Sequence, residues 1–540
     1  MAGQLRCTPR RRHHGGPGSA LCQGDAGGPT IVSARFDSIV LGATIEGLAA
    51  ACTLAKNNRS VLVIDELEFP GGAAAGREFY PGFRSSGIFP DALHVRRKLL
   101  APLNLESHGL EWRSEEPPLI VPTPEGGFPV FGDPERMLAT LSERHPADAQ
   151  AYEALQARLG RYAPILQAIL DEEPPDPTDA SIGQVLQLGK RALSVRLLGE
   201  RDMHELFRLA PLPAADWMNE RFECEALKTG LVAPVLFGTQ LGPRAAGTAA
   251  LQLLRGAARG AGPVGGPAAL VDALVQCLKG CGGELRLGDG PRSIELNAHA
   301  VEAVTLAGGD RIETPLVLSA LDPKRTLLEL LAPTAISSNI EKTAVNWRMR
   351  GSSAVLLLAL SRPLPFERAI SARSLRDLEQ AADHLKYGRL RDPIWIQVDV
   401  VSPSSRTDGG ERDERAVVAT LVAHGVPHGL RAGWDDAAAE TLESSMLEAL
   451  EGIAPGAGAT VLGRELLTPP EIERRFRLPG AHPFAGELSL DQLWLQRPGL
   501  ALSRYRTPFP GLYLGSAANH PGGPFLGGAG VLAARAALHA

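Results

Sequence analysis

The spacing of hydrophobic positions near the start of the chain changes twice within thirty residues. An apolar stretch at 38–41 leads into a turn at 42–47, then a run of small residues, LAAACTLA, and a second apolar stretch at 60–65. Short apolar runs bounded by turns predict buried strands, and the small-residue run predicts an amphipathic helix. Strand, tight turn, helix and strand in this order are typical of a βαβ unit, which has a parallel sheet.

Two later stretches have different patterns. Residues 133–260 show helical periodicity, for example in AYEALQARLGRYAPILQAIL, with proline-rich breaks such as PPDPTD. Apolar strands are expected at 352–401 (SSAVLLLALS and PIWIQVDVVS) and at 415–424 (RAVVATLVAH), followed by a helix from about 435 to 451. These patterns predict a second, discontinuous domain, a sheet covered by helices, interleaved with the βαβ domain. Pockets favour such domain junctions.

The turn at 42–47 has most of the features of a dinucleotide-binding turn. Such a turn needs one glycine for its bend, one for close approach of a pyrophosphate and one for helix packing. Gly42 and Gly47 fill the first and third positions, but Thr44 occupies the second. Its hydroxyl could itself donate to a phosphate, whereas the carboxylate of Glu46 would repel a pyrophosphate and is expected to point outward. Asp65 ends the second strand, 23 residues after Gly42, where a carboxylate can accept hydrogen bonds from an adenosine ribose. A Rossmann-like unit that has lost its nucleotide is the alternative.

The end of the chain, GLYLGSAANHPGGPFLGGAGVLAARAAL, predicts a strand, a glycine-rich loop and a helix of small residues. A glycine-crowded helix entry suits the close approach of backbone to a flat or anionic ligand. A tight structural turn before a terminal helix is the alternative.

Composition limits the classes of function. The 540 residues are 44% hydrophobic and 21% charged, as in a globular protein of about two to four domains. The net charge of -6 gives no basic surplus, so no nucleic-acid partner is expected. The longest apolar run, 354–360, is too short to span a membrane, so no transmembrane segment is expected.

Cysteine and histidine residues give little sign of a metal or of a disulfide framework. Six cysteines in so long a chain favour a reducing compartment, which predicts a cytoplasmic location. Cys277 and Cys281 have helical spacing, and His424 and His428 are interpreted as two loop histidines because a glycine and a proline separate them. No cluster completes a ligand set, so no metal is expected.

The motifs taken together resemble the flavoprotein family of phytoene (carotenoid) desaturases, most closely its branch of the pyridine nucleotide-disulfide oxidoreductase domain 2 type. The family patterns G-A-G-x-x-G-L-x-A-A, V-L-V-x-E and G-G-A correspond here to GATIEGLAAA at 42–51, VLVID at 61–65 and GGA at 71–73. Further matches are GPRAAGTA at 242–249 and VLSALDPKR at 317–325. The family's T-H-P-G has Asn519 in place of the threonine. The likeness runs in order from about 36 to 537.

This resemblance implies an FAD-dependent oxidoreductase of the desaturase or dehydrogenase type, which oxidises a hydrophobic, polyene or isoprenoid substrate by hydride transfer to non-covalently bound FAD. The implied cofactor-binding residues are Gly42, Ala43, Thr44, Gly47, Asp65, Glu66, Gly71, Gly72, Gly515, Pro521, Gly522 and Gly523. The catalytic residues stay unassigned. His520 is a weak candidate for a proton carrier and Arg244 for an anion-binding group, with a packing histidine and a surface arginine as the alternatives.

The implied fold class is α/β: a Rossmann-like FAD-binding domain of the glutathione-reductase type, interleaved with a discontinuous α+β substrate domain. We expect a disordered extension at 1–34, FAD-binding parts at 35–132, 261–335 and 495–540, a helical substrate part at 133–260 and a substrate sheet with helices at 336–494. The helical part could also contact a membrane surface peripherally, with core packing as its alternative. The alternative function is a flavin-poor, non-catalytic module that binds a partner or lipid. The sequence leaves the electron acceptor and the oligomeric state open.

Overall fold

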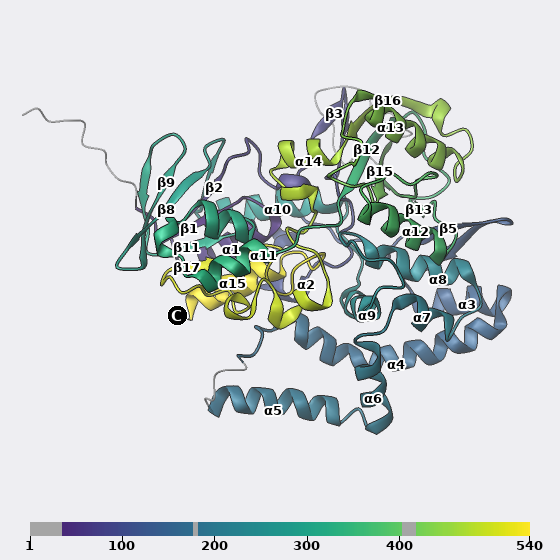
Figure 1. The fold of residues 1–540 in the computed structure, drawn as a ribbon, viewed down its shortest axis with the longest axis horizontal. Coiled ribbons are helices and arrows are strands. Elements are labelled where there is room, and N and C mark those ends of the chain that lie inside the picture. Colours follow the sequence, from purple (N-terminus) through teal and green to yellow (C-terminus); the bar gives the residue numbers. More distant parts are fainter. Residues whose placement is uncertain (1–34, 177–181, 402–416, 540) are drawn as a thin grey trace, which may run out of the picture.

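The computed structural model describes residues 35–176, 182–401 and 417–539. Two main sheets lie in different parts of the molecule, with helices around and between them (Figure 1). The expected extension at 1–34 lies outside the described residues.

The first sheet is a five-stranded parallel sheet with the order β17-β11-β1-β2-β7. Helix α1 (Ile45–Lys56) connects its central strands, so the predicted βαβ unit and the α/β fold class are confirmed. The strand order reverses at β1, whose neighbours are β2 and β11, and ligands of such sheets bind beyond the carboxyl ends of the strands at this point. The strands are β1 (Ser38–Leu41), β2 (Val61–Asp65), β7 (Glu284–Leu287), β11 (Val317–Ser319) and β17 (Leu512–Leu514).

Both faces of this sheet are covered. Val40 faces a core that α1, α10 (Gly266–Gly280) and α15 (Gly528–Leu538) complete. Ile39 and Leu41 face the opposite core, which includes residues of an antiparallel three-stranded sheet. Because successive strand residues point to opposite faces, the continuous apolar run at 38–41 is what a doubly covered strand requires. The small sheet consists of β8 (Pro291–Asn297), β9 (Ala300–Leu306) and β10 (Arg311–Glu313).

The second main sheet has seven strands in the order β16-β12-β15-β14-β13-β5-β6. Leu356 and Leu358 of β12 pack toward α13 (Asp436–Glu451), whereas Val355 and Leu357 face the opposite side. The apolar strands and the helix predicted in this region are therefore confirmed. The strands are β5 (Leu119–Thr123), β6 (Gly126–Val130), β12 (Ser353–Leu360), β13 (Arg368–Ile370), β14 (Ile396–Val401), β15 (Val417–His424) and β16 (Val461–Leu467).

The β5–β6 hairpin differs from the sequence analysis, which included it in the FAD-binding part at 35–132. Strand β5 pairs in parallel with β13, through Leu119 opposite Arg368, and so extends the seven-stranded sheet. The pairing joins residues about 250 positions apart in the sequence, and a local sequence pattern cannot predict such a contact. The other domain boundaries stay a prediction.

The stretch at 133–260 is helical, as its periodicity predicts. Figure 1 shows α5 at the edge of the molecule, beyond α4 and away from both sheets. The helices are α3 (Pro134–Arg144), α4 (Pro146–Asp171), α5 (Ile182–Arg196), α6 (Glu200–Leu209), α7 (Ala214–Asn219), α8 (Glu225–Val232) and α9 (Thr248–Ala258). The remaining α-helices and strands are α2 (Arg97–Leu100), α11 (Ser338–Asn346), α12 (Leu375–Lys386), α14 (Pro469–Phe476), β3 (Glu78–Tyr80) and β4 (Phe83–Arg84). In the described part of the chain, no helix has both the length and the hydropathy that crossing a membrane requires.

Candidate functional site

A pocket opens at the carboxyl ends of the parallel strands. Its empty volume is about 1140 Å³, part of it open to solvent. Residues that follow four of the five strands line it: Thr44 after β1, Asp65 at the end of β2, Asp322 after β11 and Ser516 after β17. The pocket thus lies where ligands of doubly wound sheets bind.

The glycine turn explains why threonine is tolerated at its second position. Gly42 has a φ of +95°, which favours glycine, and a Cβ on Gly47 would lie 1.9 Å from the Gly42 carbonyl oxygen. Thr44 has a φ of -72° and a ψ of 171°, which any residue adopts. Its hydroxyl oxygen accepts a hydrogen bond from the Gly47 N–H at 3.2 Å and so caps α1. The two positions that need glycine therefore have it.

Asp65 lies where the spacing predicted a ribose-binding carboxylate. Its two oxygens accept hydrogen bonds from the Ala43 N–H at 2.6 Å and the Leu67 N–H at 2.9 Å. A carboxylate oxygen can accept more than one hydrogen bond, so both keep capacity for a hydroxyl group in the pocket. Burial raises the pKa of the Asp65 carboxyl group.

Two arginines that the sequence analysis did not identify surround the neighbouring glutamate. Glu66 forms an ion pair with Arg325, which follows β11, and lies 3.5 Å from Nε of Arg477. All three residues line the pocket. Arg325 lies within the family-like VLSALDPKR stretch, which was the available signal for it.

Gly72 provides a test of whether the pocket could hold a flat or anionic group. Its φ is +54°, and a Cβ built on it would meet no atom within 4 Å. Because Gly72 lines the pocket, a side chain there would project into the open space. Gly71 also lines the pocket, but a Cβ there would lie 2.8 Å from Val271, so this glycine serves packing as well. The backbone at 71–72 thus forms a wall kept clear of side chains.

Glu46 does not point outward, as the sequence analysis expected. It is 4% exposed, and its carboxylate accepts hydrogen bonds at 2.7 Å from both the Gly527 and the Gly530 N–H, at the start of α15. Burial raises the pKa of Glu46 to about 7, and the backbone N–H groups of α15 oppose this rise. The helix N-terminus provides the partner that the sequence analysis did not consider.

The closing glycine-rich loop contributes less to the pocket than the resemblance implied. Gly523 lines it, but Gly515, Pro521 and Gly522 do not. A Cβ on Gly515 would lie 2.7 Å from the Ala533 Cβ, and one on Gly522 would lie 2.0 Å from Nε of Arg497. Pro521 packs against α15 at Gly528. The contacts of these three residues are packing contacts.

Neither weak catalytic candidate lines the pocket. His520 is 2% exposed, and its Nε2 lies 2.7 Å from the Ile169 carbonyl oxygen. Burial lowers its pKa to about 3, so the ring is neutral near pH 7. Arg244 is exposed, and its backbone N–H donates to Glu379. His520 is thus buried against the Ile169 carbonyl and Arg244 lies at the surface, and the roles assigned to both stay predictions.

The part of the pocket lining that packs on the seven-stranded sheet is aromatic, and we call it the aromatic end. Phe89, Phe237 and Phe484 line it, with the Phe237 ring centroid 5.4 Å from that of Phe89 and 5.2 Å from that of Phe484. His424, interpreted from sequence as a loop residue, instead ends β15, where it stacks on Trp395 at 4.3 Å. Burial lowers the pKa of His424 to about 3. Strand pairing of β15 with β12 overrides the glycine and proline that follow.

A buried network of charged side chains adjoins this aromatic end. Asp91 lines the pocket and accepts a hydrogen bond at 2.7 Å from Arg255, which is 3% exposed. Asp91 also lies 3.7 Å from Nδ1 of His94, whose pKa burial lowers to about 4. The residues come from distant parts of the chain, and the sequence analysis identified none of them.

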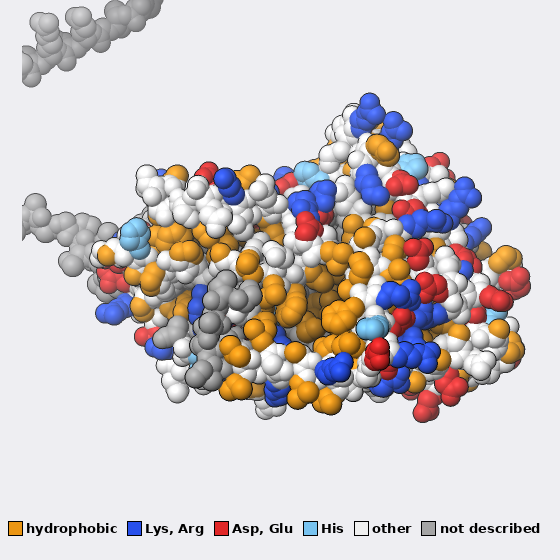
Figure 2. All heavy atoms as spheres, turned by 60° about the horizontal axis from the view of Figure 1, so that its bottom comes forward, with side chains coloured by type: hydrophobic (Ala, Val, Ile, Leu, Met, Phe, Trp, Pro, Cys, Tyr) orange, Lys and Arg blue, Asp and Glu red, His pale blue; other side chains and the backbone are white. Residues whose placement is uncertain are grey.

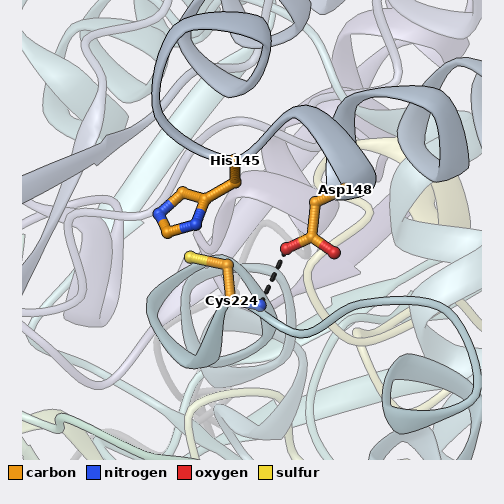
Figure 3. A group of neighbouring side chains, drawn as sticks. All are labelled: His145, Asp148 and Cys224. Carbon is orange, nitrogen blue, oxygen red and sulfur yellow. Dashed lines mark hydrogen bonds between the residues drawn. The ribbon is translucent and has the colours of Figure 1, made fainter.

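One group in the described residues has the composition of a metal site. His145, Asp148 and Cys224 point toward one another (Figure 3) and have ligand atoms within 4.8 Å. The Asp148 carboxylate, however, accepts hydrogen bonds from the backbone N–H groups of Glu223 at 2.8 Å and Cys224 at 2.7 Å, at the start of α8. Burial raises the pKa of the Cys224 thiol, which disfavours the thiolate that a metal needs. This group is therefore explained as a helix cap, and we assign it no metal.

Known proteins resemble the chain both in sequence and in fold. A family model described as an NAD(P)-binding Rossmann-like domain matches residues 40–93. Pyridine nucleotide-disulfide oxidoreductase domain-containing protein 2 of Mus musculus is 28% identical over 563 residues, which cover 96% of each chain. Phytoene desaturase (neurosporene-forming) of Cereibacter sphaeroides is 24% identical, covering 90% of this chain and 91% of the relative.

A solved structure of putrescine oxidase bound to putrescine superposes with a TM-score of 0.58 at 15% identity, covering 94% of this chain and 98% of that one. At this identity the similarity concerns the fold alone. The full-length sequence relatives confirm the resemblance predicted from the motifs. The chain is similar over nearly its whole length to these two relatives, both of which have oxidoreductase names, and it shares its fold with an oxidase.

Proposed function

We propose that the chain binds FAD non-covalently in the pocket at the parallel sheet and oxidises a hydrophobic substrate by hydride transfer to the flavin. The observation that carries the proposal is the two-ended character of this pocket. One end has the carboxylate of Asp65 and the start of α1, and the other end has the rings of Phe89, Phe237 and Phe484. A dinucleotide with a flat ring needs both kinds of surface.

Each end suits a different part of the cofactor. Asp65 is the candidate acceptor for hydroxyl groups of the adenosine ribose, and the first turn of α1 offers N–H groups to the pyrophosphate. The open wall at Gly72 leaves room for close approach. Bound FAD supplies a hydride acceptor, and the chain's own task is to orient the substrate and exclude water. The aromatic end suits this task because its described side chains are mostly apolar.

The experiment is the visible absorption spectrum of the purified protein before and after heating, for the wild type and two leucine variants. Gly72→Leu should lose its flavin because the side chain would enter the pocket. Gly82→Leu is the matched control: it has a similar positive φ of +80° and open space around its Cβ, but it is exposed and does not line the pocket. It should keep its flavin.

Two results would contradict the proposal. A Gly72→Leu protein with normal flavin content would overturn the placement of the cofactor. A colourless wild type that also fails to bind added FAD would favour the alternative function, a non-catalytic module that binds a partner or lipid.

A polyene or isoprenoid substrate is the finer part of the proposal. It is supported by the homology to a phytoene desaturase, and the apolar end of the pocket is compatible with it. Turnover of lipophilic polyenes by the flavin-loaded protein, monitored by bleaching of the flavin absorbance, is the measurement. If amines reduced the flavin and polyenes did not, this substrate class would be refuted.

We also propose that α5 contacts an anionic membrane surface peripherally. Leu186 and Leu193 are 68% and 55% exposed, and the charged residues of α5 are all basic: Lys190, Arg191 and Arg196. Figure 2 shows the face to which α5 belongs, with hydrophobic side chains gathered across its middle. A helix with exposed apolar residues and only basic charges is suited to lie in a lipid interface. A cytoplasmic location with such membrane association stays a prediction.

A further inference from the structure

A second cavity lies between the helical region and the segments at 114–116 and 131–136. Its empty volume is about 1560 Å³, including solvent at its mouth, and residues of α4, α7 and α9 line it. Several of its walls are apolar, among them Leu155, Leu159, Leu231 and Val235. The ion pair between Asp91 and Arg255 lies between this cavity and the aromatic end of the first pocket, because Asp91 lines one and Arg255 the other.

Four residues that line this cavity have buried polar atoms with no hydrogen-bond partner among the described residues. They are Nε and Nη1 of Arg255, Nε1 of Trp217, Nδ1 of His94 and Oε1 of Gln252. Arg255 and Trp217 are 3% and 2% exposed. Buried donors without a partner are costly and rare, and their concentration in one cavity indicates a ligand that completes them. Three of these atoms, two of Arg255 and one of Trp217, can only donate, whereas Oε1 of Gln252 is an acceptor whose amide nitrogen already donates to the Leu231 carbonyl oxygen at 3.5 Å.

The arginines around the cavity are already paired with carboxylates. Arg255 pairs with Asp91 at 2.7 Å, and Arg259 pairs with Glu116 at 2.5 Å. Arg368 bonds to Glu116 at 2.5 Å and to Asp399 at 3.1 Å, and at the rim Arg136 pairs with Glu115 at 2.6 Å. An added carboxylate would be an uncompensated buried charge, which is costly. An ammonium group would face donors and arginines, and among the described carboxylates of the lining only Asp133, exposed at the rim, forms no ion pair.

We propose that this cavity binds an otherwise apolar substrate through an uncharged oxygen, a carbonyl group, which accepts hydrogen bonds from Arg255 and Trp217. The inference deepens the proposed function, on which it rests for the ligand's role as substrate. A carbonyl compound differs from phytoene and from putrescine, the compounds that appear in the names of the desaturase homologue and of the oxidase with a similar fold. The apolar walls would receive the hydrocarbon part.

Binding can be measured by isothermal titration calorimetry on the protein as purified, with methyl decyl ketone, dodecylamine and dodecanoate as ligands of equal chain length. The wild type should bind the ketone more tightly than the amine or the carboxylate. Trp217→Phe removes an N–H that has no partner in the described part of the chain, so the fold should keep its stability while ketone affinity falls about 2- to 13-fold. Trp494→Phe is the matched control, because its Nε1 is also buried and unpartnered but the residue does not line the cavity.

Each contrary outcome has a distinct meaning. Equal ketone affinity in Trp217→Phe and the wild type would overturn the assignment. Tighter binding of dodecylamine or dodecanoate would overturn the uncharged carbonyl. The flavin absorbance of the same samples separates the two proposals: flavin without ketone binding refutes this inference alone, whereas ketone binding without flavin refutes the proposed cofactor.

Discussion

Replacing Glu46 with glutamine tests the most unusual feature of the cofactor turn. The Glu46 carboxylate is buried between α1 and α15 and is held by two backbone N–H groups of α15 at 2.7 Å. Burial raises its pKa from the ordinary value of 4.5 to about 7. In the unfolded chain the same group ionises near its ordinary value, so folding changes how strongly it holds its proton.

The sign of the effect follows from this difference. Below the unfolded pKa both states are protonated, and the native state has its full stability from this group. As pH rises toward about 7 the unfolded state gains its charge first, so the free energy of unfolding falls until the native carboxyl has also ionised. The difference between about 7 and 4.5, at about 1.36 kcal/mol for each pH unit, corresponds to a loss of roughly 3 kcal/mol.

The assay is urea unfolding of the wild type and Glu46→Gln at a series of pH values between about 5 and 8. Glutamine keeps one acceptor oxygen but places an NH₂ group against a backbone N–H, which costs about 1–3 kcal/mol at every pH. The wild type should therefore be more stable than the variant near pH 5, and this advantage should shrink or reverse by pH 8. Glu440→Gln, at an exposed position of α13, is the control for the substitution itself.

A stability difference between the wild type and Glu46→Gln that stays constant over this range would refute the reasoning. It would mean that the positive end of α15 and its N–H groups keep Glu46 ionised throughout. Helix dipoles typically contribute about 0.3–2 kcal/mol to such a charge, which is less than the burial effect expected here.

Two further predictions concern packing and the membrane. Gly47→Ala should destabilise the fold by about 1–3 kcal/mol or more in urea unfolding, because its Cβ would lie 1.9 Å from the Gly42 carbonyl oxygen. Gly160→Ala in α4, which has open space, should be neutral or stabilising, and equal effects of the two would contradict the packing argument. Leu186→Glu should lower binding to anionic vesicles in co-sedimentation about tenfold, whereas Leu462→Glu, exposed on β16, should not. Equal binding of both variants would refute the contact through α5.

The sequence predicted those parts of the fold that depend on local pattern. The strand at 38–41, helix α1 and the position of Asp65 follow from spacing within thirty residues, and each is where the pattern placed it. The partners of Glu46 lie about 480 positions away, and no pattern around residue 46 reports them. Tertiary packing brings these partners together. Tertiary packing also explains Gly522, which the motif predicted to face a ligand but which instead makes room for the side chain of Arg497.

The second cavity could not be predicted from the sequence for a related reason. Asp91, Arg255 and Trp217 occur in unremarkable stretches of sequence, and a single residue of each type is more often a surface or core residue than a ligand group. What identifies them is that Arg255 and Trp217 are buried with unused donors, which is a property of the folded arrangement alone. Sequence motifs predict backbone turns well because a turn is formed by consecutive residues. A substrate site that is assembled from several elements has no such local motif.

The turn at 42–47 differs from the family pattern at Thr44 and Glu46, and both differences bear on whether it can still bind a nucleotide. Thr44 was the reason to consider a degenerate site, since a Cβ stands where the family has glycine. Its backbone is extended and its hydroxyl is turned to the Gly47 N–H, so it closes the first turn of α1. Glu46 directs its charge to α15, and near pH 7 a large share of its carboxyl groups is protonated, which weakens the repulsion of a neighbouring phosphate. Each departure is thus compensated by a specific partner. Neither departure therefore places an uncompensated group in the turn that would exclude a nucleotide.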